Sequence, residues 1–311
     1  MNVLCAMLRP LGPGLFMPVL WGAVLAAMTG CAPTQHQLSE RANRIAQPSG
    51  LTPSVVATEQ FHVMTYARLD DPQQPLRVYL EGDGKAWISR TRISLNPTPH
   101  NPLALRLAAL DQAPNVVYIA RPCQYVALTT EHHCSPHYWS RARYSPAIVA
   151  AIDEVISDYV SRSGAAAGIE LVGYSGGGAL AVLVALKRQD VMSLRTVAAN
   201  LDTDLFTRLH QVTPLRESLN PADFAGALQH LPQRHYVGGE DTVIPASIAH
   251  SYWQAAGAHD CVQVRPLSGV THRDGWQDRW SALLDEALPC VSGTVAKQGF
   301  QPQTLAETDA Y

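Results

Sequence analysis

Apolar residues form short runs that alternate with segments of helical periodicity from about residue 60 onward. Most of the short runs are nearly continuous, which is typical of strands that are covered on both faces of a sheet. The expected strands are 61–67, 77–81, 116–120, 169–173, 196–201, 235–238 and 262–266. The expected helices begin at Pro146 and after Gly275 and span 176–187 and 246–256. This alternation predicts an α/β fold with a mostly parallel, doubly wound sheet.

The amino-terminal segment has a different pattern. Residues 11–28 are almost entirely apolar and small, and positive charge precedes them, which predicts a signal peptide over residues 1–30. The sequence MTGC at 28–31 resembles the end of a bacterial lipoprotein signal, in which the cysteine is lipidated and becomes the first residue. The resemblance implies a lipid on Cys31 and a cell-envelope location, on the periplasmic face or in the outer membrane. A plain signal peptide or an uncleaved anchor is the alternative.

The rest of the chain is long enough for one α/β domain. A polar segment at 31–54 is expected to be a tether, and the domain is expected over 55–290. The long connection 202–234 is expected to be a short lid. Residues 291–311 are expected to be a loose polar tail.

Composition narrows the possible partners and compartment. The formal net charge of −3 gives no reason to expect nucleic acid as a partner. Four cysteines remain after Cys5 and Cys31 are set aside, and an even number in an oxidising compartment suggests two disulfides. Proximity in the sequence favours the pairs Cys123–Cys134 and Cys261–Cys290. Four buried free thiols are the alternative.

The strongest chemical signal is the sequence GYSGG at residues 173–177. It follows the apolar run 169–172 and precedes a helix that begins with small residues. This is the context of the Gly-x-Ser-x-Gly elbow, in which the serine sits on a strained turn between strand and helix. Ser175 is therefore the candidate nucleophile, at the positive end of a helix dipole. The alternative is a chance match in a glycine-rich turn.

With these residues, the chain resembles the α/β-hydrolase superfamily over roughly residues 60–290. In that family the acid and then the histidine follow the serine, each on a loop after a later strand. The resemblance assigns the acid to Asp241, in the segment 235–245, with its neighbour Glu240 as the rival. It assigns the base to His272, which follows the last expected strand.

Two backbone amides are the expected oxyanion-hole donors. Gly176 follows the nucleophile and supplies one. The second is expected from the turn after strand 77–81, which resembles the family's His-Gly loop although Glu81 stands where His is common. We favour the amide of Asp83 over that of Gly84, and a simple glycine-rich turn is the alternative. Glu81 and Asp83 are expected to place negative charge near the pocket and to disfavour anionic substrates.

The resemblance implies hydrolysis of carboxylic esters, small-molecule or lipid, through an acyl-enzyme and without cofactor or metal. A thioesterase, a peptidase and a catalytically silent lipoprotein that binds an envelope component are the alternatives. The segment 131–137 holds several metal-capable side chains, but adjacent histidines rarely chelate one ion together. We expect this segment to be a polar surface loop.

Overall fold

The structure is a computed structural model, and it describes residues 33–128, 133–164 and 167–290 of the chain. The described residues from Gln35 onward belong to one structural unit. The expected signal peptide, Cys31 and the tail 291–311 lie outside the described residues. None of the helices in the described part is long and apolar enough to cross a membrane.

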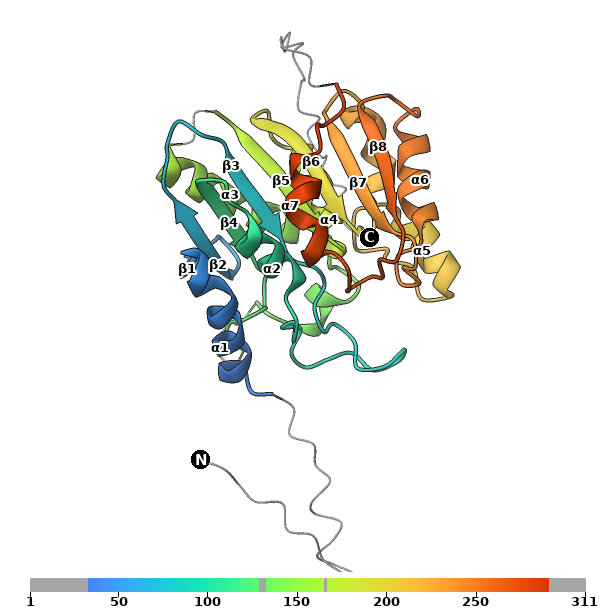
Figure 1. The fold of residues 1–311 in the computed structure, drawn as a ribbon. Helices are drawn as coiled ribbons and strands as arrows, with labels where there is room; N and C mark the ends of the chain where they lie inside the picture. Colours follow the sequence, from blue (N-terminus) through green and yellow to red (C-terminus); the bar gives the residue numbers. More distant parts are fainter. Residues whose placement is uncertain (1–32, 129–132, 165–166, 291–311) are drawn as a thin grey trace, which may run out of the picture. The chain divides into compact units, whose positions relative to one another are not determined.

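The sheet of the described domain has eight strands in the order β1-β2-β4-β3-β5-β6-β7-β8 (Figure 1). The strands are β1 (Thr52–Ala57), β2 (His62–Leu69), β3 (Leu76–Leu80), β4 (Asn115–Ile119), β5 (Ile169–Tyr174), β6 (Val191–Val197), β7 (Gln233–Gly238) and β8 (Val262–Leu267). The pairs β1–β2 and β2–β4 are antiparallel, and the other neighbours are parallel. The predicted mostly parallel sheet is confirmed.

Helices cover both faces of this sheet. They are α1 (Gln35–Ala46), α2 (Leu103–Leu110), α3 (Pro146–Ser163), α4 (Gly176–Ala185), α5 (Thr203–His210), α6 (Ala246–Ala255) and α7 (Gln277–Asp285), with 3-10 turns η2 (Gln47–Ser49), η3 (Pro136–Trp139) and η4 (Pro221–Leu228). One core joins α3, α4 and α6 to one face of the sheet, and a second joins α1, α2 and α7 to the other. Successive strand residues alternate between them, since Val78 and Leu80 belong to the first core and Tyr79 to the second.

Helix α4 lies at the centre of the first core. All of its residues are buried, and its sequence is apolar on every side, as expected for a helix that is enclosed on all sides. Helix α3 instead has one apolar stripe, which includes Ile148, Ile152 and Tyr159 and faces the same core. It begins at Pro146, whose fixed φ suits the first position of a helix.

The segment expected to be a tether is structured over most of its length. Helix α1 buries Leu38, Ala42 and Ala46 in the second core, and β1 pairs along its whole length with β2. The i, i+4 spacing of these three residues places them on one face of the helix, but the polar residues around them dominate the composition. The folded domain therefore extends to about residue 35 and not only to residue 55.

The strand predicted at 196–201 also differs, because β6 occupies Val191–Val197. Its Ser193 and Arg195 interrupt the hydrophobic pattern although both are buried. The chain leaves the strand at Ala198, where φ is +48°. The apolar residues after it therefore belong to the loop that follows the strand.

The segment 202–234, expected to be a lid, has two unlike halves. The half that contains η4 buries Ala225 and Leu228 in the first core and is therefore part of the domain body. The half that contains α5 ends near the loop after β7, where His210 Nε2 lies 2.8 Å from the carbonyl oxygen of Val243. The half that contains α5 therefore stands among the loops at the carboxyl ends of the strands.

Candidate active site

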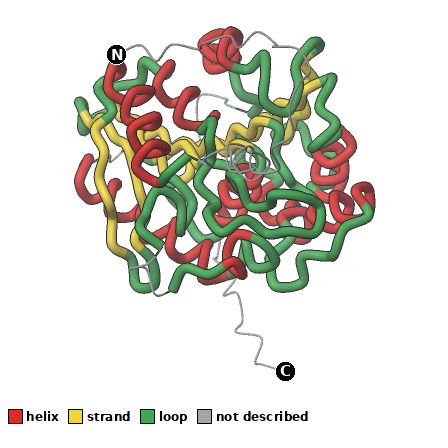
Figure 2. The backbone as a smooth tube through the Cα atoms, turned by 90° about the horizontal axis from the view of Figure 1, so that it is seen from below, coloured by secondary structure: helices red, strands yellow, loops and turns green. Residues whose placement is uncertain are grey.

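Three polar side chains lie on loops that follow β5, β7 and β8. Ser175 comes directly after β5, Asp241 follows β7, and His272 follows β8. The carboxyl ends of parallel strands share one edge of a sheet, so these loops meet there. Figure 2 views the domain from this side and shows loops covering the strand ends.

The structure brings these three side chains into one hydrogen-bonded line. His272 Nε2 lies 3.2 Å from Ser175 Oγ, and His272 Nδ1 lies 2.8 Å from Asp241 Oδ2. The Asp241 side chain is fully buried, and that of His272 is 11% exposed. Glu240 is exposed, and the carboxylate that faces the imidazole is that of Asp241.

The Asp241 carboxylate is fixed on both oxygens. Oδ1 accepts hydrogen bonds from the amides of Val243 and Ile244, each at 2.8 Å, while Oδ2 faces His272. These amides belong to the turn just before α6, so the chain that follows β7 orients the Asp241 carboxylate. A carboxylate held in this way can accept the Nδ1 proton and stabilise an imidazolium.

Ser175 occupies a strained turn. Its φ is +52° and its ψ is −119°, a conformation that L-residues rarely adopt and that costs about 1–3 kcal/mol. Its amide donates to Val197 O at 2.9 Å, and its carbonyl oxygen accepts from Gly178 N at 3.0 Å and Asn200 N at 3.2 Å. These bonds hold the backbone so that the side chain projects from the elbow.

The glycines of the elbow are required by close backbone packing. A Cβ on Gly173 would stand 2.4 Å from Gly177 O, and one on Gly177 would stand 2.1 Å from Leu80 O. Both distances are shorter than any real contact of a methyl group. The packing of α4 onto β5 and β3 therefore explains why the motif has glycine on both sides of the serine.

The turn after β3 lies against Ser175. A Cβ added to Gly82 would stand 3.2 Å from Ser175 Cβ, and one added to Gly176 would stand 2.0 Å from Asp83 Oδ1. Gly176 is the first residue of α4, and a helix leaves its first amides without intrahelical partners. The turn Gly82–Asp83 and the first residue of α4 thus lie against each other beside Ser175.

The Asp83 carboxylate is held by three side chains that the sequence did not single out. Oδ1 accepts from Arg121 Nη1 at 2.7 Å, and Oδ2 accepts from Arg143 Nη1 at 2.8 Å and from the Tyr144 hydroxyl at 3.1 Å. Burial alone would raise the pKa of Asp83, but the two guanidinium groups outweigh it and hold that pKa below its usual value. Arg121 also donates to the carbonyl oxygen of Arg143.

These contacts correct the expected charge of the site. Two arginines oppose the one carboxylate of Asp83, so this cluster is not a source of net negative charge. Glu81 is only 1% exposed, and burial raises its pKa to about 7. Its Oε1 accepts from Gly82 N at 2.9 Å, which anchors the start of the turn. The expectation that anionic substrates are disfavoured is therefore not supported by the charges of the site.

The loop that carries His272 is braced from two sides. The Tyr174 hydroxyl donates to the carbonyl oxygen of His272 at 3.3 Å, and the Tyr174 and His272 rings lie 5.4 Å apart. The indole of Trp276, which is fully buried, donates to the carbonyl oxygen of Thr271 at 3.0 Å. The imidazole is therefore positioned by its own backbone as well as by Asp241.

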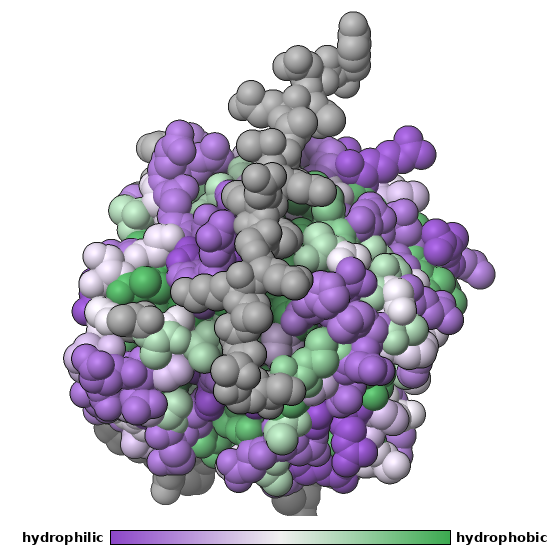
Figure 3. All heavy atoms as spheres, turned by 90° about the horizontal axis from the view of Figure 1, so that it is seen from above, coloured by the Kyte–Doolittle hydropathy of each residue, from purple (hydrophilic) through white to green (hydrophobic). Residues whose placement is uncertain are grey.

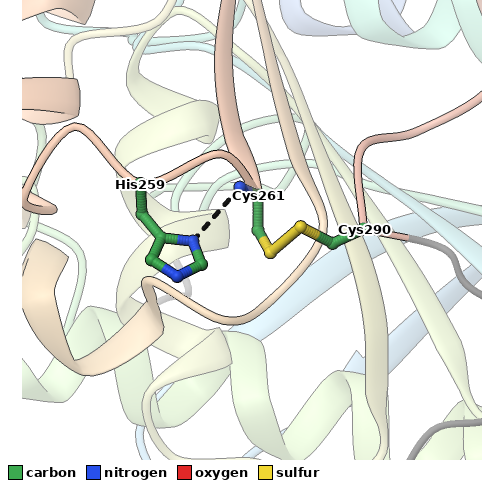
Figure 4. Close-up of side chains that lie close together, drawn as sticks. All are labelled: His259, Cys261 and Cys290. Atoms are coloured by element: carbon green, nitrogen blue, oxygen red, sulfur yellow. Dashed lines mark hydrogen bonds between the residues drawn. A yellow bond between two sulfur atoms is a disulfide. The ribbon is translucent and has the colours of Figure 1, made fainter.

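The structure contains both disulfides that sequence proximity favours, Cys123–Cys134 and Cys261–Cys290. His259 lies beside the second, with its Nδ1 accepting from the amide of Cys261 at 3.2 Å (Figure 4). The three possible ligand atoms lie within 4.8 Å of one another. Because both sulfurs are bonded to each other, neither is a thiolate that could bind a metal ion.

The segment 131–137 also holds several metal-capable side chains, and its described part, 133–137, is a surface loop. Cys134 is in a disulfide, His137 Nδ1 lies 3.4 Å from Glu217 Oε2, and the ring of His133 packs against Phe61. Residues 131 and 132 lie outside the described residues.

Comparisons with known proteins give structural matches only. No family model matches the sequence, and no curated protein matches it. An esterase from Pyrococcus furiosus superposes with a TM-score of 0.53 at 10% identity, covering 76% of this chain and 91% of its own. Est1E from Butyrivibrio proteoclasticus gives 0.52 at 11%, covering 74% and 95%. A protein of unknown function from Agrobacterium tumefaciens, named as a suspected α/β hydrolase, gives 0.51 at 11%, covering 76% and 98%. The chain therefore has the α/β-hydrolase fold.

Proposed function

We propose that this protein is a serine hydrolase that cleaves carboxylic esters. The observation that carries the proposal is the continuous line from Ser175 Oγ through both nitrogens of His272 to Asp241 Oδ2. A serine hydroxyl is a weak nucleophile until a positioned base accepts its proton. This arrangement, on a strained elbow at the start of a helix, is the one that such activation requires.

The reaction proceeds in two halves. Ser175 Oγ attacks the acyl carbon while His272 Nε2 takes the hydroxyl proton, and the Nδ1–H group donates to Asp241. The imidazolium then gives its proton to the alcohol oxygen, the ester C–O bond breaks, and an acyl-serine remains. A water molecule repeats the attack with His272 as base, which releases the acid and restores the serine.

The oxyanion of each tetrahedral intermediate would accept hydrogen bonds from the amides of Gly176 and Asp83. Both belong to backbone that lies next to the nucleophile. The Asp83 carboxylate also lies against Gly176, and its charge alone would oppose a developing oxyanion. Arg121 and Arg143 neutralise that charge, so the donors can act in a field that is not negative.

Ester hydrolysis is preferred over thioester or peptide hydrolysis because one structural neighbour is an esterase. The triad geometry itself serves all three substrates. The natural ester would be a small molecule or a lipid. No step of this mechanism needs a cofactor.

A fluorophosphonate probe combined with a short activated ester tests the proposal. Both should react with the wild-type protein and fail with the Ser175→Ala variant. Ser281→Ala, at an exposed position on α7, is the matched control and should keep full labelling and turnover. Equal labelling of Ser175→Ala and wild type would show that the elbow is only a structural turn. Parallel assays with a thioester and an anilide separate the three reaction classes.

We further propose that Cys31 carries lipid and holds the protein in the cell envelope. The apolar run and the MTGC sequence that precede the domain support this. Mass spectrometry of the amino-terminal peptide should show a diacylglyceryl modification on Cys31, which the Cys31→Ser variant lacks. An unmodified Cys31, or a mature chain that starts elsewhere, would contradict it.

A further inference from the structure

Exposed apolar side chains gather at the end of the domain where the candidate active site lies. Nine large apolar side chains are exposed in the described residues, and six of them belong to three segments at this end. They are Trp87 (39% exposed), Ile88 (46%), Leu95 (83%), Leu209 (49%), Val212 (39%) and Val243 (44%). We call these six residues the apolar rim.

Hydrogen bonds join the three segments into one surface. Arg90 Nη2 donates to the carbonyl oxygen of His210 at 3.3 Å, which links the loop after β3 to the end of α5. His210 Nε2 in turn lies 2.8 Å from Val243 O, two residues beyond Asp241. The rim therefore borders the loop that carries the triad acid.

The loop that contributes half of the rim is a projecting hairpin. Trp87 pairs with Ile93 in an isolated bridge, and Ser94 N donates to Ala86 O at 2.9 Å. Trp139 Nε1 donates to Ser94 O at 3.0 Å and ties the base of the hairpin to η3. Figure 1 shows this teal segment extending beyond the carboxyl ends of the strands. Its apolar side chains are thus presented on a fixed support.

The same hairpin is basic. Lys85, Arg90 and Arg92 are all exposed, and no Asp or Glu occurs from residue 84 to residue 110. An exposed Trp with neighbouring aliphatic and basic side chains suits the boundary between lipid headgroups and acyl chains. Cations near anionic headgroups add an attraction that salt screens.

The beginning of the folded domain is attached to this hairpin. Gln35 Oε1, in the first residue of α1, accepts from Asn96 Nδ2 at 2.8 Å and from Thr98 Oγ1 at 3.3 Å. Only three residues separate Gln35 from Cys31 in the sequence. A chain of that length spans at most about 14 Å when fully extended. A lipid on Cys31 would therefore hold the hairpin close to the membrane surface.

From these observations we propose that the apolar rim and its three cations dock on an anionic phospholipid bilayer. The rim inserts among the headgroups, and the carboxyl ends of the strands face the lipid. This contact is separate from the lipid on Cys31 and from catalysis, and it would give the protein a fixed orientation on the membrane. The opposite end of the domain shows mainly hydrophilic residues around scattered apolar ones where it is visible in Figure 3.

Fluorescence quenching by phospholipids brominated in their acyl chains tests the contact directly. The full chain is reconstituted with phosphatidylcholine vesicles, with or without phosphatidylglycerol. The difference between wild type and Trp87→Phe isolates the signal of Trp87. We expect Trp87 to be quenched in the anionic vesicles and to lose most of this quenching at high salt. Each cation near such a surface changes the docking equilibrium about fivefold, so Arg90→Gln with Arg92→Gln should weaken docking about 25-fold.

Matched variants distinguish docking through the apolar rim from nonspecific hydrophobic binding to the bilayer. Leu95→Ser should reduce the quenching of Trp87, whereas Met192→Ser, which is 47% exposed on β6, should not. Equal quenching of wild type and Trp87→Phe in anionic vesicles would overturn the proposal. A dimer in detergent that Leu95→Ser dissociates would also overturn it, because the rim would then bind a second copy. The hydrolase proposal is independent of all these outcomes.

Discussion

Arg143 Nη1 donates to Asp83 Oδ2 at 2.8 Å, and this contact neutralises a carboxylate that lies against Gly176. The side chain of Asp83 thus links the proposed second oxyanion donor to the segment 121–144. Arg121 makes the corresponding contact to the other oxygen at 2.7 Å. The turn after β3 is therefore held by the ion pairs that Asp83 makes with both arginines.

Replacement of either arginine should therefore impair the chemical step. Arg143→Gln leaves Asp83 partly uncompensated beside the oxyanion and loosens the turn, so kcat should fall on the order of 10-fold to 100-fold with little change in KM. Steady-state kinetics on an activated ester measure both values. Arg188→Gln is the matched control, since Arg188 is equally buried and paired with Asp153 and Asp190. An unchanged kcat in Arg143→Gln would show that the pair is only structural.

Asp241→Asn should keep the fold and lose activity. The oxygen of the new side-chain amide can still accept hydrogen bonds from the backbone N–H groups of residues 243 and 244. The side-chain amide as a whole, however, favours the wrong tautomer of His272. The same change in the triad of a serine protease lowers kcat by about 10⁴-fold. Glu240→Gln changes the neighbouring exposed carboxylate and should leave kcat within about twofold of wild type. A larger loss from Glu240→Gln than from Asp241→Asn would reverse the assignment of the acid.

Ser175 and His272 should behave as one unit. Alanine at either position should lower kcat by several orders of magnitude, and the double variant should be little worse than either single one, because each change alone already disables the nucleophile. Single-turnover assays on the three variants measure this. Losses that multiply in the double variant would mean that the two residues do not share a mechanism.

Glu81 makes the stability of the fold depend on pH. Burial raises its pKa from 4.5 to about 7, so the folded state prefers the protonated carboxyl. The unfolded state binds fewer protons than the folded state between these values, and stability contributed by this group is present below about pH 4.5 and lost as the pH rises to about 7. The loss amounts to about 3 kcal/mol.

Urea unfolding of wild type and Glu81→Gln at a series of pH values tests this. The neutral amide can still accept from Gly82 N, so the variant should lack the decline and should be the more stable protein at pH 8. The relevant quantity is the difference in unfolding free energy between the two proteins, which removes the contribution of other groups. A difference that is constant between pH 4.5 and pH 8 would contradict the raised pKa.

The sequence predicted those parts of the fold that depend on the pattern of consecutive residues. Continuous apolar runs located most strands within one or two residues, as in 169–173 against β5. The order of Ser175, Asp241 and His272 followed from the resemblance to a superfamily, because each residue stands just after a strand. Helix α1 escaped prediction since its buried face packs against segments that are distant in the sequence, such as α2. Strand β1 pairs with the adjacent β2 but has no fully buried residue, so it lacks the apolar run that located the other strands.

The support of the site could not be predicted, because it depends on contacts between separate loops. Nothing near Arg121 or Arg143 in the sequence indicates that both meet the carboxylate of Asp83. The departure of Glu81 from the family's histidine was visible, but its burial was not. The sequence shows which groups are charged, and only the fold shows which charges are opposed.

The disulfide Cys261–Cys290 connects the start of β8 to the chain after α7, and the His272 loop lies between these points. Replacing both cysteines with serine frees a segment of 29 residues, which should lower the free energy of unfolding by about 4 kcal/mol in the chain-entropy model. The Cys123–Cys134 pair spans 11 residues and should cost about 3 kcal/mol when replaced in the same way. Urea unfolding of the two double variants measures which loss of stability is the larger.

Because Asp241, Tyr174 and Trp276 also hold the His272 loop, kcat at low temperature should fall less than tenfold in either variant. A smaller loss of stability for the 261–290 pair than for the 123–134 pair would show that loop length does not govern the contribution of these bridges.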